Sequence, residues 1–143
     1  MKDSRIGSYG VLTLIMVMST RVASLSYLPC QIDLIILLIG CAVFSRLIMV
    51  TYLCFLPSAR DKGLGNQASG QDKGVLFWAI SISMPVLWLG LPIMALSLLI
   101  MTISAFLWAY IAKRQIGGQT GDICGAGQVL CETTGWLTLL VVL

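Results

Sequence analysis

The sequence predicts an all-α membrane protein, a polytopic helix bundle of about five transmembrane helices. Its 143 residues are 58% hydrophobic and only 10% charged, with a mean hydropathy of +0.95, whereas soluble domains carry about 25% charged residues. Apolar runs of the length that crosses a bilayer, about 20 residues as helix, follow one another along the chain. A single integral-membrane domain, residues 1–143, therefore accounts for the whole sequence.

Residues 9–28 and 34–56 form the first two predicted spans. Each run is long enough to cross a hydrocarbon core of about 30 Å as a helix. Each carries one charged side chain, Arg21 in the first and Arg46 in the second. The first run is too long for the apolar core of a secretory signal peptide, and no small-residue cleavage site follows it. We therefore expect this run to remain in the protein as a span.

Residues 75–112 hold no charged side chain. They are too long for one span, because at 1.5 Å per residue a straight helix of them would extend about 57 Å. The natural break is the sequence LGLP, since glycine is permissive and proline fits the first turn of a following helix. These features predict two spans, 75–90 and 92–112. A fifth predicted span, 123–143, contains Glu132.

Basic residues between the predicted spans set the orientation. With five spans, every segment that carries Lys or Arg falls on one side of the membrane, and cytoplasmic loops are the ones with an excess of Lys and Arg. We therefore predict a multi-pass protein of the cell (inner) membrane with its N-terminus and active face in the cytoplasm. The residues behind this prediction are Lys2, Arg5, Arg60, Lys62, Lys73, Lys113 and Arg114.

Two charged side chains fall near the middle of the predicted spans. Arg46 and Glu132 each lie about 15 Å from the cytoplasmic end of their span, at 1.5 Å per residue. An unpaired charge at that depth costs several kcal/mol. Equal depth and opposite charge predict an ion pair, which is expected to hold helices together rather than to line a transport or substrate pathway. Arg21 is expected near the far side, where it can snorkel to the interface.

The composition excludes several kinds of site. Without histidine, the chain has no histidine general base, no Ser-His triad and no histidine ligand for haem or catalytic zinc. Its five cysteines form no CxxC pair, and most lie in apolar runs, where a thiol behaves as a small hydrophobic group, so no disulfide framework is expected. A net charge of +3 is too small and too dispersed to indicate nucleic-acid binding.

The sequence RQIGGQTGDICGA, residues 114–126, interrupts the apolar pattern. Its glycines let the backbone turn and approach a ligand, and the helix that follows would present N-terminal N–H groups to an anion. Guanidinium and backbone N–H groups suit phosphate, and a carboxylate beside them suits Mg²⁺. The predicted cytoplasmic face gathers such groups from three segments: Arg5, Arg60, Lys62 and Arg114, with the carboxylates Asp3, Asp61, Asp72 and Asp122.

Simpler explanations account for the same residues. Thr120 or Asp122 can serve only as the N-cap of the next helix. Gly121 and Gly125 form a GxxxG pair that can pack two spans closely, and the 60–74 loop can be a solvated linker. Neither GxxxxGK[ST] nor GxGxxG occurs in the chain. Spacing alone favours these explanations and leaves a phosphate site open.

Three segments taken together resemble one enzyme family. MKDSRIGSYG at the start, SRLIMVTYLCFLPSARDKGLG in the middle and IGGQTGDICGAGQVLCE toward the end are similar, in order and near spacing, to segments of the cobalamin synthases, the adenosylcobinamide-GDP ribazoletransferases. The resemblance runs from residue 1 to about residue 135, and GGQTGDICGA is its most specific part.

The resemblance implies a transferase of cobalamin biosynthesis. Its substrates are adenosylcobinamide-GDP and α-ribazole or its 5′-phosphate, and its products are adenosylcobalamin or its 5′-phosphate and GMP. It also implies Mg²⁺ as a cofactor with Asp122 as a metal ligand, because phosphoryl transfer relies on positioning and charge neutralisation. The residues then assigned to the substrate phosphates are Arg5, Arg60, Arg114, Gly117, Gly118, Thr120 and Gly121, with Lys2 on the same face.

The chain also departs from the family pattern. In the family, MKDSRIGSYG follows an N-terminal portion with further spans and an aspartate-rich motif. We therefore expect the chain to be the C-terminal part of such an enzyme, either a fragment or a truncated product. Its expected partners are membrane lipid and either the missing N-terminal portion or further copies of itself in a homo-oligomer. Two other functions stay open: a small membrane channel or transporter subunit with Arg46 and Glu132 along its pathway, and an inserted remnant without activity.

Overall fold

The computed structural model describes residues 8–28, 32–58 and 73–143. These ranges form helices α1 (Ser8–Tyr27), α2 (Ile32–Phe55), α4 (Lys73–Ile116) and α5 (Gly121–Val142). Within them no strand forms, and one isolated bridge joins Ser58 to Gln119. The predicted all-α fold is confirmed, and the bounds of α1, α2 and α5 lie within two residues of the spans expected from hydropathy.

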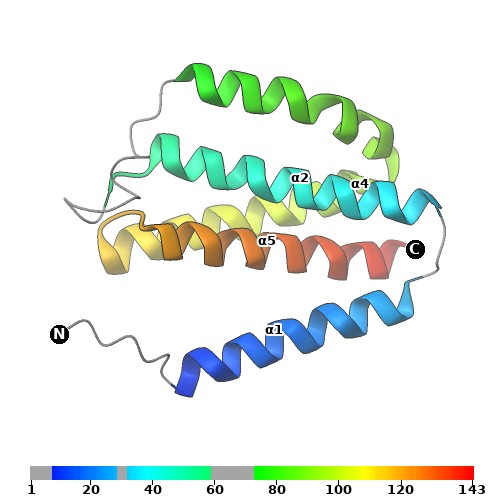
Figure 1. Cartoon of the computed structure of the whole chain (residues 1–143), viewed down its shortest axis with the longest axis horizontal. Coiled ribbons are helices and arrows are strands. Elements are labelled where there is room, and N and C mark those ends of the chain that lie inside the picture. Colours follow the sequence, from blue (N-terminus) through cyan, green and yellow to red (C-terminus); the bar gives the residue numbers. More distant parts are fainter. Residues whose placement is uncertain (1–7, 29–31, 59–72) are drawn as a thin grey trace.

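Helix α4 differs from the two separate helices that the sequence predicts. It is one helical element, Lys73–Ile116, but Figure 1 shows its path reversing, so that the green limb and the yellow limb run in opposite directions. The reversal separates the apolar stretches Gly74–Trp88 and Met94–Ile116. Sharp changes of helix direction are expected at Gly and Pro, and Gly90 and Pro92 lie between these stretches. The predicted change of direction is present without a break in the helix.

Three helical stretches of the described residues are long and apolar enough to cross a membrane: Gly10–Tyr27, Leu34–Phe55 and Met94–Ile116. Gly74–Trp88 is apolar but shorter. Most large hydrophobic side chains on Gly10–Tyr27 and Met94–Ile116 are exposed, as expected where lipid is the solvent. The chain is a polytopic membrane helix bundle.

Helix α5 occupies the centre of the bundle and packs against α1, α2 and α4. In Figure 1 it lies between α1 and α2, with α1 set apart from the other helices. Its sequence includes Gln128, Glu132 and three threonines. A central position allows these polar groups, because neighbouring helices and not lipid surround them. The core that α5 shares with α2 and α4 includes the buried residues Cys41, Met94, Met101, Cys131 and Leu139.

Close packing of α5 depends on Gly127 and Gly135. A Cβ atom built at Gly135 would lie 2.6 Å from Met101 Sδ and 3.2 Å from Cys41 Sγ. A Cβ atom at Gly121 or Gly125 would meet no other atom of the described residues within 4 Å. Among the described residues, Gly121 and Gly125 therefore pack no helix closely, and the helix-packing glycines lie further along α5.

Replacing Gly135 with alanine should destabilise the bundle. The added methyl group forces Met101 and Cys41 to move, and overpacking of this kind costs about 1–3 kcal/mol. Gly125→Ala is the matched control, because it adds the same methyl group to the same helix in open space and should stabilise the helix by about 0.5–1 kcal/mol. The free energy of unfolding in mixed micelles measures both. Equal effects of the two substitutions would contradict this account of α5 packing.

Candidate functional site

The turn between α4 and α5 contains the glycines singled out in the sequence. Gly117 has a φ of +82°, which favours glycine, and its N–H donates to the carbonyl oxygen of Lys113 at 3.2 Å. This geometry ends α4 in the manner of a glycine C-cap. Lys113 and Arg114 occupy the exposed last turn of α4, where cations interact favourably with the helix dipole.

The turn is attached to the end of α2. The Gln119 N–H donates to the Pro57 carbonyl oxygen at 2.7 Å, and Gln119 forms the isolated bridge with Ser58. Figure 1 shows that α1 and α4 also begin at this end of the bundle, whereas α1 ends and α2 begins at the opposite end. The structure therefore places together the helix ends that flank the three segments expected on one face. Arg5 and Arg60 lie outside the described residues, as do Lys2, Asp3, Asp61, Lys62 and Asp72.

Thr120 is the N-cap of α5. It has an extended backbone (φ −131°, ψ 163°), and its side-chain oxygen accepts a hydrogen bond from the Ile123 N–H at 3.3 Å. Of the two predicted caps, Thr120 is confirmed, and Asp122 instead lies inside the first helical turn. The Asp122 side chain is exposed, and no hydrogen bond or ion pair joins its carboxylate to another residue in the described ranges. Its carboxylate is therefore available to solvent or to a ligand.

The surroundings of Asp122 are open. Gly121 and Gly117 are exposed, and no atom of the described residues lies within 4 Å of the position that a Cβ would take at either glycine. Gly118 differs, because it is buried beneath the turn. The exposed surface of the turn thus combines a helix N-terminus, a carboxylate, permissive backbone and the cationic end of α4. The sequence-predicted residues that it brings into one segment are Arg114, Gly117, Gly118, Thr120, Gly121 and Asp122.

Gln119 is a residue of this turn that the sequence did not single out. Its side chain is 1% exposed, and its Oε1 accepts a hydrogen bond from Cys124 Sγ at 3.2 Å. Its Nε2 has no hydrogen-bond partner in the described structure. The only sequence signal for Gln119 is its place within GGQTGD, where it looks like another polar loop residue. The structure shows instead that Gln119 attaches the turn to Pro57 at the end of α2 and to Cys124 in α5.

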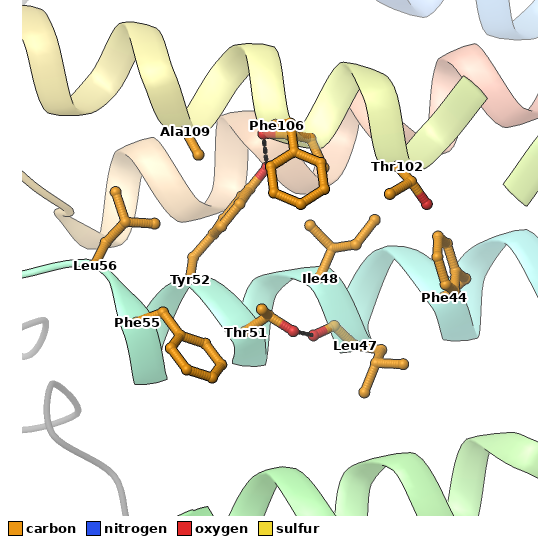
Figure 2. A pocket seen from close by; sticks show the side chains of 11 residues that line it. Phe44, Leu47, Ile48, Thr51, Tyr52, Phe55, Leu56, Thr102, Phe106 and Ala109 are labelled. Atoms are coloured by element: carbon orange, nitrogen blue, oxygen red, sulfur yellow. Dashed lines mark hydrogen bonds between the residues drawn. The ribbon is translucent and has the colours of Figure 1, made fainter. Parts of the chain in front are cut away.

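An apolar groove of about 460 Å³ lies along α2 and the second limb of α4. Figure 2 shows side chains from both helices around it, and Tyr52 crosses from α2 to α4. Its hydroxyl groups are engaged: Thr51 donates to the Leu47 carbonyl oxygen, Thr102 to Leu98 and Tyr52 to Ala105. The groove therefore offers an apolar surface and no free hydroxyl group. Its lining comprises Phe44, Leu47, Ile48, Thr51, Tyr52, Phe55, Leu56, Thr102, Ala105, Phe106 and Ala109.

The structure pairs Glu132 with Arg21. Arg21 Nη2 lies 2.9 Å from Glu132 Oε2, Arg21 Nε donates to Thr133 Oγ1 at 3.0 Å, and the guanidinium carbon lies 5.0 Å from the centre of the Trp136 ring. Arg46 is exposed and donates to the Ala42 carbonyl oxygen of its own helix at 3.0 Å. The predicted pair of Arg46 with Glu132 is therefore wrong, and so is the expectation that Arg21 snorkels to the interface.

The error has a geometric cause. Depth along a helix was used to predict the pair, but contact also requires that both side chains lie on facing sides of neighbouring helices. At 1.5 Å per residue, Arg21 lies about 20 Å along α1 from Ser8, and Glu132 about 17 Å along α5 from Gly121. These depths differ by about 3 Å, so depth along the helices does not by itself tell which arginine meets Glu132.

The expected absence of a disulfide framework agrees with Cys41, Cys54, Cys124 and Cys131, which are all free. Cys30 lies outside the described residues.

Comparison with known proteins identifies the family. The cobalamin-5-phosphate synthase (CobS) family matches residues 1–140. The chain belongs to this family. The GGQTGDICGA segment, on which the resemblance chiefly rested, therefore lies in the family's matched region.

Curated relatives support the assignment. A protein of Allorhizobium ampelinum is 32% identical over 152 aligned residues, which cover 100% of this chain and 59% of the relative. Proteins of Bradyrhizobium diazoefficiens and Azorhizobium caulinodans are each 36% identical, over 99% of this chain and 54% and 56% of their own lengths. All three are named adenosylcobinamide-GDP ribazoletransferase. This member of the CobS family thus spans somewhat more than half the length of these relatives. No solved structure matches the chain.

Removing either partner of the Arg21–Glu132 pair should destabilise this CobS family member. Arg21→Ala and Glu132→Ala should each lower the free energy of unfolding, by a few kcal/mol at most, because water and snorkelling soften the cost of an unpaired charge. The double substitution should cost less than the sum of the two. Unfolding in mixed micelles, followed by helical circular dichroism, measures these values. Arg46→Ala is the control and should add independently to Glu132→Ala; coupling of Arg46 with Glu132 would contradict the observed pairing.

Proposed function

We propose that this chain forms the phosphate-binding face of an adenosylcobinamide-GDP ribazoletransferase of cobalamin biosynthesis. The names of the relatives supply the reaction. The observation that carries the proposal is the exposed Asp122 carboxylate, which follows a capped helix N-terminus and is surrounded by open glycines. Such a surface suits a diphosphate, because N-terminal N–H groups bind anions.

In this reaction, a hydroxyl group of α-ribazole, or of its 5′-phosphate, attacks the phosphorus atom attached to cobinamide. The bond between that phosphorus atom and the bridging oxygen of the diphosphate breaks, and GMP leaves with the bonding electron pair. The hydroxyl group gives up its proton. The products are adenosylcobalamin, or its 5′-phosphate, and GMP. This chemistry depends on in-line positioning and on stabilising the charge of the phosphate oxygens.

Residues of the α4–α5 turn contribute to both requirements. The N–H groups of the first turn of α5 point out of the helix end and donate to phosphate oxygens. Gly121 and Gly117 let a ligand approach the backbone, while Arg114 supplies a positive charge from the neighbouring helix end. We assign Arg5 and Arg60 to the same phosphates by their place in the family segments.

Mg²⁺ is part of the proposal. The described residues contain no group of three or more His, Cys, Asp or Glu side chains arranged to hold a metal. A single carboxylate nevertheless fits Mg²⁺, which commonly binds through one or two carboxylates together with substrate phosphate oxygens. Asp122 is the residue that would hold the ion, since its carboxylate is exposed and has no partner in the described ranges. When bound, Mg²⁺ supplies positive charge that neutralises the diphosphate.

The proposed location is the cell (inner) membrane, with the α4–α5 turn in the cytoplasm. Lys113 and Arg114 lie at the turn. Figure 1 shows that α1 begins, α2 ends and α4 begins at this same end of the bundle, and these helix ends adjoin the other basic segments in the sequence. The positive-inside rule then favours the cytoplasm for this end. A channel or transporter role has less support, because the predicted pathway pair of Arg46 and Glu132 does not form and Glu132 is bound to Arg21.

Asp122→Asn should abolish most ribazole transfer without preventing folding. Thr120 caps α5, so the substitution removes the charge and leaves the cap in place, at a cost of a few tenths of a kcal/mol to 1 kcal/mol from the helix dipole. Transfer should fall by orders of magnitude, and the Mg²⁺ concentration for half-maximal rate should rise. The assay uses a protein with the family's full length, in which ribazole transfer can be measured.

Asp33→Asn is the matched control for the loss of a carboxylate. Asp33 is in the first turn of α2, at the opposite end of the bundle. The Asp33→Asn substitution should leave the rate of ribazole transfer and its Mg²⁺ dependence unchanged. Normal transfer by Asp122→Asn at limiting Mg²⁺ would remove the metal from the proposal.

The orientation predicts which side of the membrane each turn faces. Gln115 and Pro57 are exposed at the proposed cytoplasmic end, and Tyr27 is exposed at the end of α1. Single cysteines at the first two positions, in a background without the native cysteines, should react with a membrane-impermeant maleimide only in inside-out vesicles. A cysteine in place of Tyr27 should react only in right-side-out vesicles. Reaction of Gln115→Cys and Pro57→Cys from opposite sides would refute the topology.

A further inference from the structure

Trp108 connects α4 to the first turn of α5. Its indole Nε1–H donates to the carbonyl oxygen of Ile123 at 2.9 Å. Ile123 directly follows Asp122, and Trp108 lies on α4 shortly before Lys113 and Arg114. The hydrogen bond therefore closes the α4–α5 turn at its base, with the glycines of the candidate site inside the closed segment.

The position of the Trp108 ring depends on Gly127. A Cβ atom at Gly127 would lie 2.7 Å from Trp108 Cδ1 and 2.8 Å from Tyr52 Cε2. Aromatic rings from two helices thus fill the space next to this glycine, and an added methyl group would have to displace them. Tyr52 is held in turn, because its hydroxyl donates to the Ala105 carbonyl oxygen at 2.8 Å, as Figure 2 shows.

Two further contacts hold the same turn from other directions. The Gln119 N–H is bound to Pro57 at the end of α2, and the Cys124 thiol donates to Gln119 Oε1. These contacts fix Gln119. They do not fix the distance between α4 and the first turn of α5. Among the described residues, the bond from Trp108 Nε1 to the Ile123 carbonyl oxygen is the side-chain hydrogen bond that joins α4 to that first turn.

We propose that Trp108 is a positioning residue of the candidate site, which sets the N-terminus of α5 against the cationic end of α4. Gly127 and Tyr52 fix the ring so that its N–H reaches Ile123. The identity of the anion bound there rests on the proposed function, whereas the positioning of the turn does not. The role is separable from general stability, because it acts on one end of α5.

Two buried cysteines on α5 report on this difference. Cys124 is 1% exposed and lies in the first turns of the helix, and Cys131 is 0% exposed and lies further along. Local opening of the turn exposes the Cys124 thiol alone. Loss of packing throughout the bundle exposes both thiols.

The experiment measures the rates at which N-ethylmaleimide labels Cys124 and Cys131 in membranes, with mass spectrometry of peptides to assign each label. Trp108→Phe removes the N–H group and keeps an aromatic ring. It should raise the Cys124 rate about two- to tenfold, as expected for the loss of one hydrogen bond, and leave the Cys131 rate unchanged. Gly127→Ala keeps the N–H group but displaces the ring, and should also raise the Cys124 rate.

Trp136→Phe is the matched control. Trp136 is an α5 tryptophan whose Nε1 has no hydrogen-bond partner in the described structure, so removing its N–H breaks no such bond. This substitution should leave the Cys124 rate unchanged. An equal rise at Cys124 and Cys131 in Trp108→Phe, or no rise at Cys124 in either test variant, would overturn the positioning role.

A second measurement connects the turn to its ligand. Inorganic pyrophosphate with Mg²⁺ should slow labelling of Cys124 in the unaltered protein, because a bound anion holds the first turn of α5 closed. The pyrophosphate concentration for half protection should rise severalfold in Trp108→Phe, and an unchanged concentration would overturn the link between Trp108 and binding. If pyrophosphate gives no protection to the unaltered protein while Trp108→Phe still speeds Cys124 labelling, the proposed function fails at this site and the positioning role stands.

Discussion

The fold depends on one constraint: a helix with polar side chains in a membrane protein must be surrounded by other helices. Helix α5 carries Gln128, Glu132 and three threonines, and it contacts all the other described helices. Its glutamate is neutralised by Arg21, and its threonines donate to carbonyl oxygens of their own helix. Since lipid offers no hydrogen bonds, the central place of α5 follows from its composition. The remaining helices can then expose apolar faces without penalty.

The same central helix carries the candidate site at one end. The polar face of α5 is needed inside the bundle, while its N-terminus emerges beside the ends of α2 and α4. A rigid, centrally packed helix is a suitable base for an anion site, because the direction of its N–H groups is fixed by contacts along its whole length. The chain belongs to the CobS family, and the proposed diphosphate ligand of this surface follows from that membership. The chain spans only part of the length of its relatives.

Several features were predictable from local sequence, and others required the fold. Hydropathy predicted the bounds of α1 and α2 closely, because polar residues flank both apolar runs. Thr120 was a predictable cap, since capping uses residues that are neighbours in sequence. The partner of Glu132 was not predictable, because hydropathy gives depth but not the direction in which Arg21 or Arg46 points. The contact of Trp108 with Ile123 likewise depends on how α4 and α5 cross, which no short motif encodes.

The Arg21–Glu132 pair has a consequence for how the protein is made. Its partners lie on the first and the last described helices, 111 residues apart in sequence. Synthesis proceeds from the N-terminus, so α1 is already in the membrane when α5 leaves the ribosome. Glu132, near the centre of a moderately apolar helix, opposes the insertion of α5 into lipid. Arg21, which is already in the bilayer, offsets that charge. Insertion of α5 thus depends on α1, and the bundle closes only after α5 has been synthesised.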